Sequence, residues 1–193
     1  MSGEFDTFKN KNRINRNRIA LDLELSTSDG PILSIGMEHI VSGEQFEMGI
    51  RYNSLLVEPE AMSVNKIDIR EMLTPEYDKK FKNGADYIGK VDEAARKWIE
   101  ERIGSENIRM VAVGFQVGTV DVPLTKRYLK GTGSRIDWQV IDLNTYALIK
   151  DDEFGFEQGT VRKRMLEGYE VTHKALDDSH IAAEKYRQII AFG

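Results

Sequence analysis

The sequence predicts a mixed α/β domain, and three observations favour this fold class. Short runs of alternating apolar and polar residues fill residues 19–52, a continuous apolar run lies at 108–115, and strand-like and helix-like runs alternate beyond it. Strands that first follow one another and later alternate with helices are typical of a mixed sheet covered by helices. A chain of 193 residues can bury one substantial core, so we expect a single domain over residues 18–193.

The N-terminal residues predict a basic arm outside that domain. Cations alternate there with asparagines, and the cations are Lys9, Lys11, Arg13, Arg16 and Arg18. We assign residues 1–17 to this arm, which is a solvated tail, a contact between copies of the chain or a grip on a substrate.

Three strands are predicted to open the domain as an antiparallel meander. Residues 19–25 alternate with a period of two, turn residues follow at 26–31, and residues 32–37 and 45–52 give two further strands. Residues 59–73 and 77–81 then indicate short helical pieces.

The second half of the chain alternates between strands and helices. The run at 108–115 contains β-branched residues, as expected for a central strand buried on both faces. Pro123 fits the first turn of the helix that follows, where a missing N–H costs little. The other predicted elements are helices at 91–103 and 119–129, a strand at 136–143, a short helix through 149, an acidic loop at 151–160 and a helix at 175–191.

The composition excludes several classes of site and protein. The chain has no cysteine, which rules out a disulfide framework, a thiolate nucleophile and a zinc–sulfur site. No run approaches the roughly 18 apolar residues of a membrane span, and the N-terminus is charged, so we expect a cytoplasmic protein with no membrane partner. A net charge of −5 argues against coating nucleic acid through net charge alone, although a local cleft can differ.

Asp22 and Glu24 are the first candidate metal ligands. The period of two places both side chains on one face of a strand. Hard divalent cations prefer paired carboxylates, and a bound cation offsets the repulsion between them. The alternative is a strand with one solvated face.

Three further residues complete the candidate site. Asp121 follows a buried strand and begins a helix, the place where ligand groups of open α/β sheets tend to lie. His173 precedes the last predicted helix, and Asp178 lies inside it, close enough for the two to converge on one site. Each residue also has an interpretation without a function. An acid in the first turn of a helix can simply stabilise the helix dipole, and a histidine near a helix start is commonly a surface residue.

Taken together, these motifs resemble the DEDDh family of 3′–5′ exonucleases. DLELS at 22–26 is similar to the D-L-E-M-T start of that family, VDVPL at 120–124 to its F-D-L-P-F segment, and HKALDD at 173–178 to H-x-A-x-x-D. PEAMSVNKI at 59–67 and VIDL at 140–143 resemble two supporting family segments. The tail from Asp177 to Arg187 is particularly like oligoribonuclease, and the chain also resembles ribonuclease T and proofreading exonucleases of this family.

One segment departs from the family pattern. FQVG at 115–118 stands where family members usually have an H-N or N-S pair, and Val120 replaces the usual aromatic residue. The family's contact to the substrate sugar or terminal nucleotide is therefore not carried over, whereas all four carboxylates and the histidine are present.

The resemblance implies a ribonuclease H-like fold with a five-stranded mixed sheet flanked by helices. It also implies two Mg²⁺ or Mn²⁺ ions, held mainly by Asp22, Glu24 and Asp178 with Asp121 completing the cluster, and His173 as the general base. The implied activity is 3′–5′ exonuclease cleavage of single-stranded DNA or RNA, releasing nucleoside 5′-monophosphates. A homodimer and a polymerase partner are left open, and the alternative function is a module that binds a nucleic-acid end or a polymerase without cutting.

Overall fold

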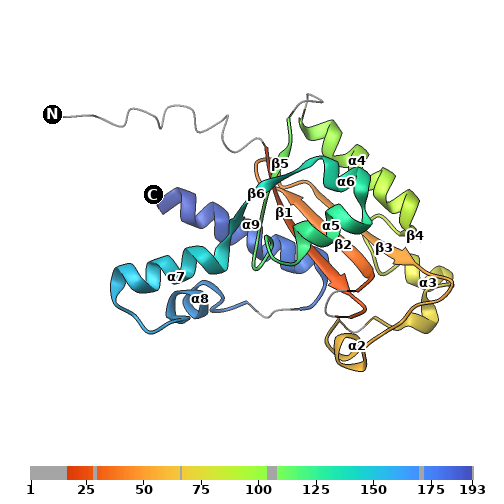
Figure 1. Cartoon of the computed structure of the whole chain (residues 1–193), viewed down its shortest axis with the longest axis horizontal. Helices are drawn as coiled ribbons and strands as arrows, with labels where there is room; N and C mark the ends of the chain where they lie inside the picture. Colours follow the sequence, from red (N-terminus) through yellow and green to blue (C-terminus); the bar gives the residue numbers. More distant parts are fainter. Residues whose placement is uncertain (1–16, 28–29, 66, 104–107, 170–171, 193) are drawn as a thin grey trace.

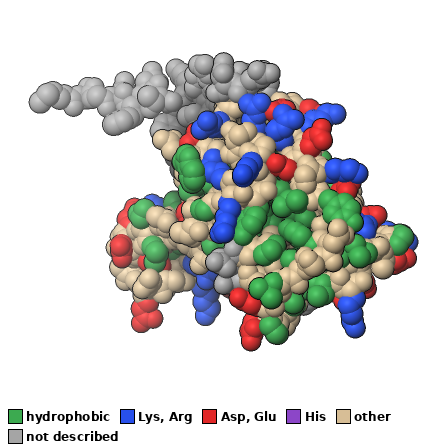
Figure 2. Space-filling model, turned by 45° about the vertical axis from the view of Figure 1, so that its right-hand side comes forward, with side chains coloured by type: hydrophobic (Ala, Val, Ile, Leu, Met, Phe, Trp, Pro, Cys, Tyr) green, Lys and Arg blue, Asp and Glu red, His purple; other side chains and the backbone are tan. Residues whose placement is uncertain are grey.

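The computed structural model describes residues 17–27, 30–65, 67–103, 108–169 and 172–192 (Figure 1). The predicted basic arm therefore lies outside the described residues, apart from Asn17. Within the described ranges, no helix has the length and apolar character needed to cross a bilayer. Figure 2 shows Lys and Arg side chains gathered over the upper part of one face, so the net charge of −5 does not describe every surface.

The core of the molecule is one mixed sheet with the strand order β4-β3-β2-β1-β5-β6. The strands are β1 (Arg18–Leu25), β2 (Ile32–His39), β3 (Gln45–Arg51), β4 (Ala85–Tyr87), β5 (Met110–Gly114) and β6 (Ile136–Asp142). The predicted antiparallel meander of β1, β2 and β3 is confirmed. The structure further shows that β5 pairs in parallel with β1 and with β6.

The sheet has six strands rather than the five predicted. The additional strand, β4, spans three residues and pairs in parallel with the end of β3. A run this short has no measurable periodicity, and only its pairing with β3 defines it as a strand, so the sequence could not have indicated it.

Helices cover both faces of the sheet. They are α2 (Pro59–Asn65), η2 (Ile69–Glu71), α3 (Pro75–Asp78), α4 (Ile88–Ile103), α5 (Asp121–Tyr128), α6 (Lys130–Ser134), α7 (Leu143–Phe154), α8 (Thr160–Met165) and α9 (Ala175–Phe192). Figure 1 shows α4, α5 and α6 on one face and α9 crossing the other. Helices α6 and α8 were not predicted, and the other described helices differ from the predicted ones mainly at their ends, because local patterns fix helix boundaries poorly.

Strand β1 is buried on both of its faces. Leu21 and Leu23 join a core with α4 and α5, whereas Ala20 packs in a second core with Ala182 and Tyr186 of α9. Since side chains alternate along a strand, Asp22 and Glu24 lie on the same face as Ala20, toward α9. The alternative of a solvated face is therefore wrong for β1.

Helix α9 approaches the sheet closely at Gly36. Gly36 is the partner of Asp22 in the β1–β2 pairing, and a Cβ added to it would lie 2.2 Å from the backbone of Ala175, the first residue of α9. Further along, Arg187 of α9 pairs with the buried Glu38 of β2 at 2.6 Å. Gly36 thus lets the first turn of α9 lie directly against the strand opposite Asp22.

The predicted acidic loop at 151–160 is wrong over its first part. Helix α7 continues to Phe154 and ends at Gly155, which has the left-handed φ of 66° that glycine tolerates. Asp151 is only 1% exposed, and its carboxylate accepts hydrogen bonds from the Gly159 N–H at 2.7 Å and the Val161 N–H at 2.8 Å. This carboxylate fixes the start of α8, a helix that the sequence analysis did not predict.

Candidate metal centre

Three of the predicted carboxylates converge on one point. Asp22 and Glu24 come from β1 and Asp178 from the first turn of α9, and one oxygen from each lies within 4.8 Å of the others. The alternation along β1 aims both of its acids at α9, and the close approach at Gly36 brings Asp178 to them. Asp177, the neighbouring acid, is exposed and lies near Lys174 instead.

The surroundings of these carboxylates oppose their ionisation. Glu24 is 8% exposed, and burial together with the charges of Asp178 and Asp121 raises its pKa to about 8. Burial, followed by the charges of Asp121, Glu24 and Asp178, also raises the pKa of Asp22. The pKa of Asp178 is raised as well, chiefly by burial. Each group is stabilised as a neutral acid unless a positive charge lies among them.

A divalent cation fits this donor set. Among the described residues, no Lys, Arg or His forms an ion pair with Asp22, Glu24 or Asp178. The donors are all carboxylate oxygens, the ligands that hard cations such as Mg²⁺ prefer. The arrangement therefore suits a compact positive charge at the point where the three oxygens meet.

Asp178 also shapes the chain that leads into α9. One of its oxygens accepts hydrogen bonds from the Thr172 N–H at 3.1 Å and the Thr172 hydroxyl at 3.3 Å, and the other accepts from the His173 N–H at 3.1 Å. His173 has a φ of 53°, in the left-handed region, so the chain turns sharply just before the helix. The carboxylate thus fixes the loop that carries His173.

Asp121 lies beside the three-carboxylate group, not within it. It is 5% exposed, and its Oδ1 accepts a 3.0 Å hydrogen bond from the Leu23 N–H, between the two acids of β1. Burial raises its pKa to about 7, although that hydrogen bond acts in the opposite direction. Its charge nevertheless reaches Asp22 and Glu24, because it raises the pKa of both.

His173 is half-buried next to the cluster, and its charge lowers the pKa of Asp178. It does not belong to the group of three ligand atoms that meet within 4.8 Å. This position is consistent with a group that acts beside a metal centre, and its role as a base stays a prediction.

The structure adds two residues that the sequence analysis did not place in the site. Phe115, at the end of β5, and Arg162, on α8, line a pocket of about 100 Å³ together with Asp22 and Asp178. The sequence analysis noted Phe115 only as a departure from a family motif. The basic run at 162–164 was the one available signal for Arg162.

Comparisons with known proteins support the fold. No protein-family model matches the chain, and no curated protein matches it. Among solved structures, the chain is similar to exonuclease X, solved in complex with 5′ overhanging duplex DNA. The TM-score is 0.54 at 16% identity, and the match covers 91% of this chain and 92% of that one. At this identity the likeness shows the fold, which confirms the predicted ribonuclease H-like architecture.

The cluster predicts an unusual dependence of stability on pH. The folded chain holds protons on Asp121 up to about pH 7 and on Glu24 up to about pH 8, whereas unfolded carboxyls release them near pH 4. A raised folded pKa gives stability that is lost as pH rises through it. In EDTA, we therefore expect the cluster to lower the melting temperature progressively between about pH 4 and pH 8.

The variant Glu24→Gln is the matched control, because it removes one of the titrating groups while keeping nearly the same shape. We expect its melting temperature to fall less over this pH range, and excess Mn²⁺ to reduce the fall in the unmodified protein. A decline of equal size in Glu24→Gln would contradict the assignment of the raised pKa to this cluster.

Proposed function

We propose that this protein is a metal-dependent 3′–5′ exonuclease that hydrolyses single-stranded DNA or RNA and releases nucleoside 5′-monophosphates. The observation that carries the proposal is the convergence of the buried Glu24 with the half-buried Asp22 and Asp178 in a group that no described cation neutralises. The fold shared with exonuclease X supports the class of reaction. A polymerase partner, a homodimer and a cytoplasmic location stay predictions from the sequence.

In this proposal, each residue of the centre has a separate task. Two Mg²⁺ or Mn²⁺ ions, held by Asp22, Glu24 and Asp178 with Asp121 nearby, would supply Lewis acidity at the phosphate and lower the pKa of water. His173 accepts the proton that the attacking water loses as the new P–O bond forms and the P–O3′ bond breaks. Asp178 has a second task, because its hydrogen bond to the His173 N–H positions the loop that carries the base.

The alternative function is a module that grips a nucleic-acid end or a polymerase without cutting. The segment at 115–118, which departs from the family pattern before Asp121, is the observation in its favour. The intact carboxylates argue against it, because a module that only binds phosphates would gain from losing negative charge that faces them.

The test is incubation with matched 5′-labelled DNA and RNA oligomers, single- and double-stranded, with Mg²⁺ or Mn²⁺. We expect a ladder of labelled products that shorten from the 3′ end, together with nucleoside 5′-monophosphates. Comparing DNA with RNA, and single-stranded with double-stranded oligomers, identifies the preferred substrate. A metal-dependent rise in melting temperature without any cleavage would instead favour the binding module.

A further inference from the structure

Helix α8 contributes to the pocket at the proposed metal centre, in addition to β1 and α9, which supply the carboxylates. The pocket of about 100 Å³ is lined by Asp22 and Asp178, by Arg162 of α8 and by Leu166, the residue that follows α8. Arg162 is the one cation among the described residues that line it. A positively charged side chain therefore reaches the space in front of the acids without forming an ion pair with them.

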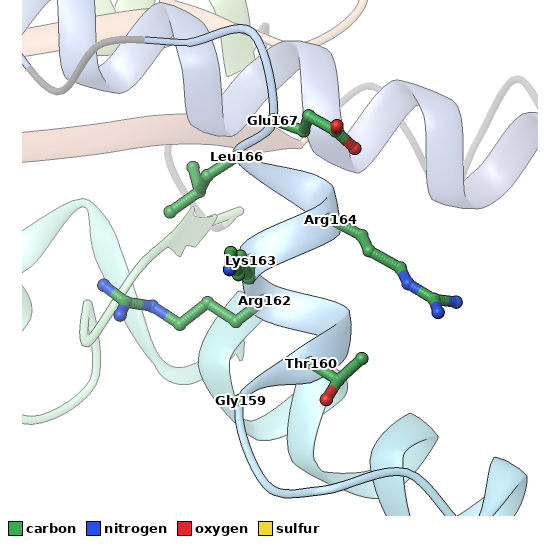
Figure 3. A pocket seen from close by; sticks show the side chains of 7 residues that line it. All are labelled: Gly159, Thr160, Arg162, Lys163, Arg164, Leu166 and Glu167. Atoms are coloured by element: carbon green, nitrogen blue, oxygen red, sulfur yellow. The ribbon is translucent and has the colours of Figure 1, made fainter.

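Arg162 also lines a larger hollow that runs along α8. This hollow has a volume of about 740 Å³ and is lined by residues from Gly159 to Glu167 (Figure 3). Figure 3 shows the side chains of Arg162 and Leu166 extending to the same side of the helix, while Arg164 extends to the opposite side. Arg162 thus lies where the hollow and the acidic pocket meet.

The guanidinium of Arg162 has no partner among the residues that the structure describes. Neither a hydrogen bond nor an ion pair connects it to another described side chain, and the residue is exposed. Arg164, on the same helix, instead lies over the ring of Phe156, with its Cζ 4.5 Å from the ring centre. The two arginines therefore differ in surroundings, and Arg162 keeps its donors available for a ligand.

The position of Arg162 is fixed through the backbone before it. The buried carboxylate of Asp151 accepts hydrogen bonds from the N–H groups of Gly159 and Val161, the residue next to Arg162. A buried acid that the proposed chemistry does not use thus holds the start of α8. This contact gives Asp151 a positioning role.

We propose that Arg162 binds a phosphate adjoining the one that is cut, and that the hollow along α8 holds the neighbouring part of the nucleic-acid strand. The inference rests on the proposed function and adds a strand-binding site to it. A guanidinium can donate two parallel hydrogen bonds to a phosphate, which a lysine cannot do. The metal ions would neutralise charge at the acids and at the phosphate that is cut, so a cation from the protein would favour binding of the next phosphate along the strand.

The test measures binding of a labelled single-stranded oligonucleotide by fluorescence anisotropy over a series of salt concentrations, with Ca²⁺ and after a check that no cleavage occurs. We expect Arg162→Ala to weaken binding roughly tenfold or more. The slope of log affinity against log salt should become shallower by about 0.7, the value for one phosphate contact on a single strand. Arg162→Lys should restore the slope while recovering only part of the affinity.

Arg109→Ala is the matched control, because Arg109 is exposed, lines neither the hollow nor the pocket and precedes β5, at the opposite end of that strand from Phe115, so its loss should leave the salt slope unchanged. Affinity for Mn²⁺, measured by calorimetry, should stay the same in all three variants. Equal losses in Arg162→Ala and Arg109→Ala would overturn the inference in favour of a diffuse basic surface, and lost Mn²⁺ affinity would overturn it in favour of a structural role.

The inference and the proposed function fail in different ways. An Arg162→Ala variant with unchanged affinity and slope, in a protein that still cleaves, overturns only the inference. An unmodified protein that neither binds nor cleaves either nucleic acid overturns both.

Discussion

Asp22→Asn is expected to abolish cleavage while leaving the protein folded. The change replaces one of the three converging carboxylates by a neutral amide, and loss of the several kcal/mol that a metal ion contributes corresponds to roughly a thousandfold or more in rate. It also removes a charge that its neighbours repel, so the metal-free variant should be as stable as the unmodified protein or slightly more stable. Cleavage of labelled oligomers with Mg²⁺ and thermal melting in EDTA measure the two effects.

Two acids of α9 give this prediction its controls. Asp178→Asn should abolish cleavage too, but it should also lower stability, because the variant has only one oxygen in place of the two that accept hydrogen bonds from Thr172 and His173. Asp177→Asn changes the exposed neighbour and should cleave normally. Near-normal cleavage by Asp22→Asn with Mg²⁺ would show that the metal centre is wrongly assigned.

His173→Ala is expected to reduce the rate by roughly 10²- to 10⁴-fold, the usual effect of removing a positioned base. The rate of the unmodified protein should rise with pH as the base loses its proton, and the variant should lack that rise. Affinity for Mn²⁺ should largely survive, because His173 is not among the three converging ligands. Rate profiles against pH and calorimetric Mn²⁺ titrations measure these outcomes.

The backbone at His173 requires a second variant. Its φ of 53° is unfavourable for alanine, so part of the loss in His173→Ala can come from a displaced loop. Asparagine tolerates this conformation better and cannot act as the base, so His173→Asn should be equally slow. Rates restored by asparagine, or Mn²⁺ affinity lost as completely as in Asp178→Asn, would assign a structural or ligand role to His173.

The parts of the site that the sequence predicted are those that local patterns encode. A period of two is enough to place Asp22 and Glu24 on one face of a strand, and β1 and α9 were both found by their periodicity. The sequence did not show which face of β1 is covered. That depends on the contact of α9 with Gly36, between residues distant in the sequence.

The parts that the sequence missed depend on such distant contacts. Asp151 and its acidic neighbours are typical of a loop, and only the hydrogen bonds to Gly159 and Val161 explain why Asp151 is buried in a helix. Strand β4 exists only because β3 pairs with it. Arg162 lines the pocket because Asp151 fixes the start of α8, and the basic run at 162–164 alone could not have placed it there.

The three carboxylates come from two distant parts of the sequence, and this separation has a consequence during protein synthesis. Asp22 and Glu24 leave the ribosome early, but Asp178 is made more than a hundred residues later, in the helix that must dock against Gly36. Because domains generally fold as units while the chain grows, a nascent chain without α9 has two of the three converging carboxylates and an open face where the third belongs. We therefore expect a partly made chain to lack the proposed nuclease activity, because its metal centre is missing one of the three carboxylates.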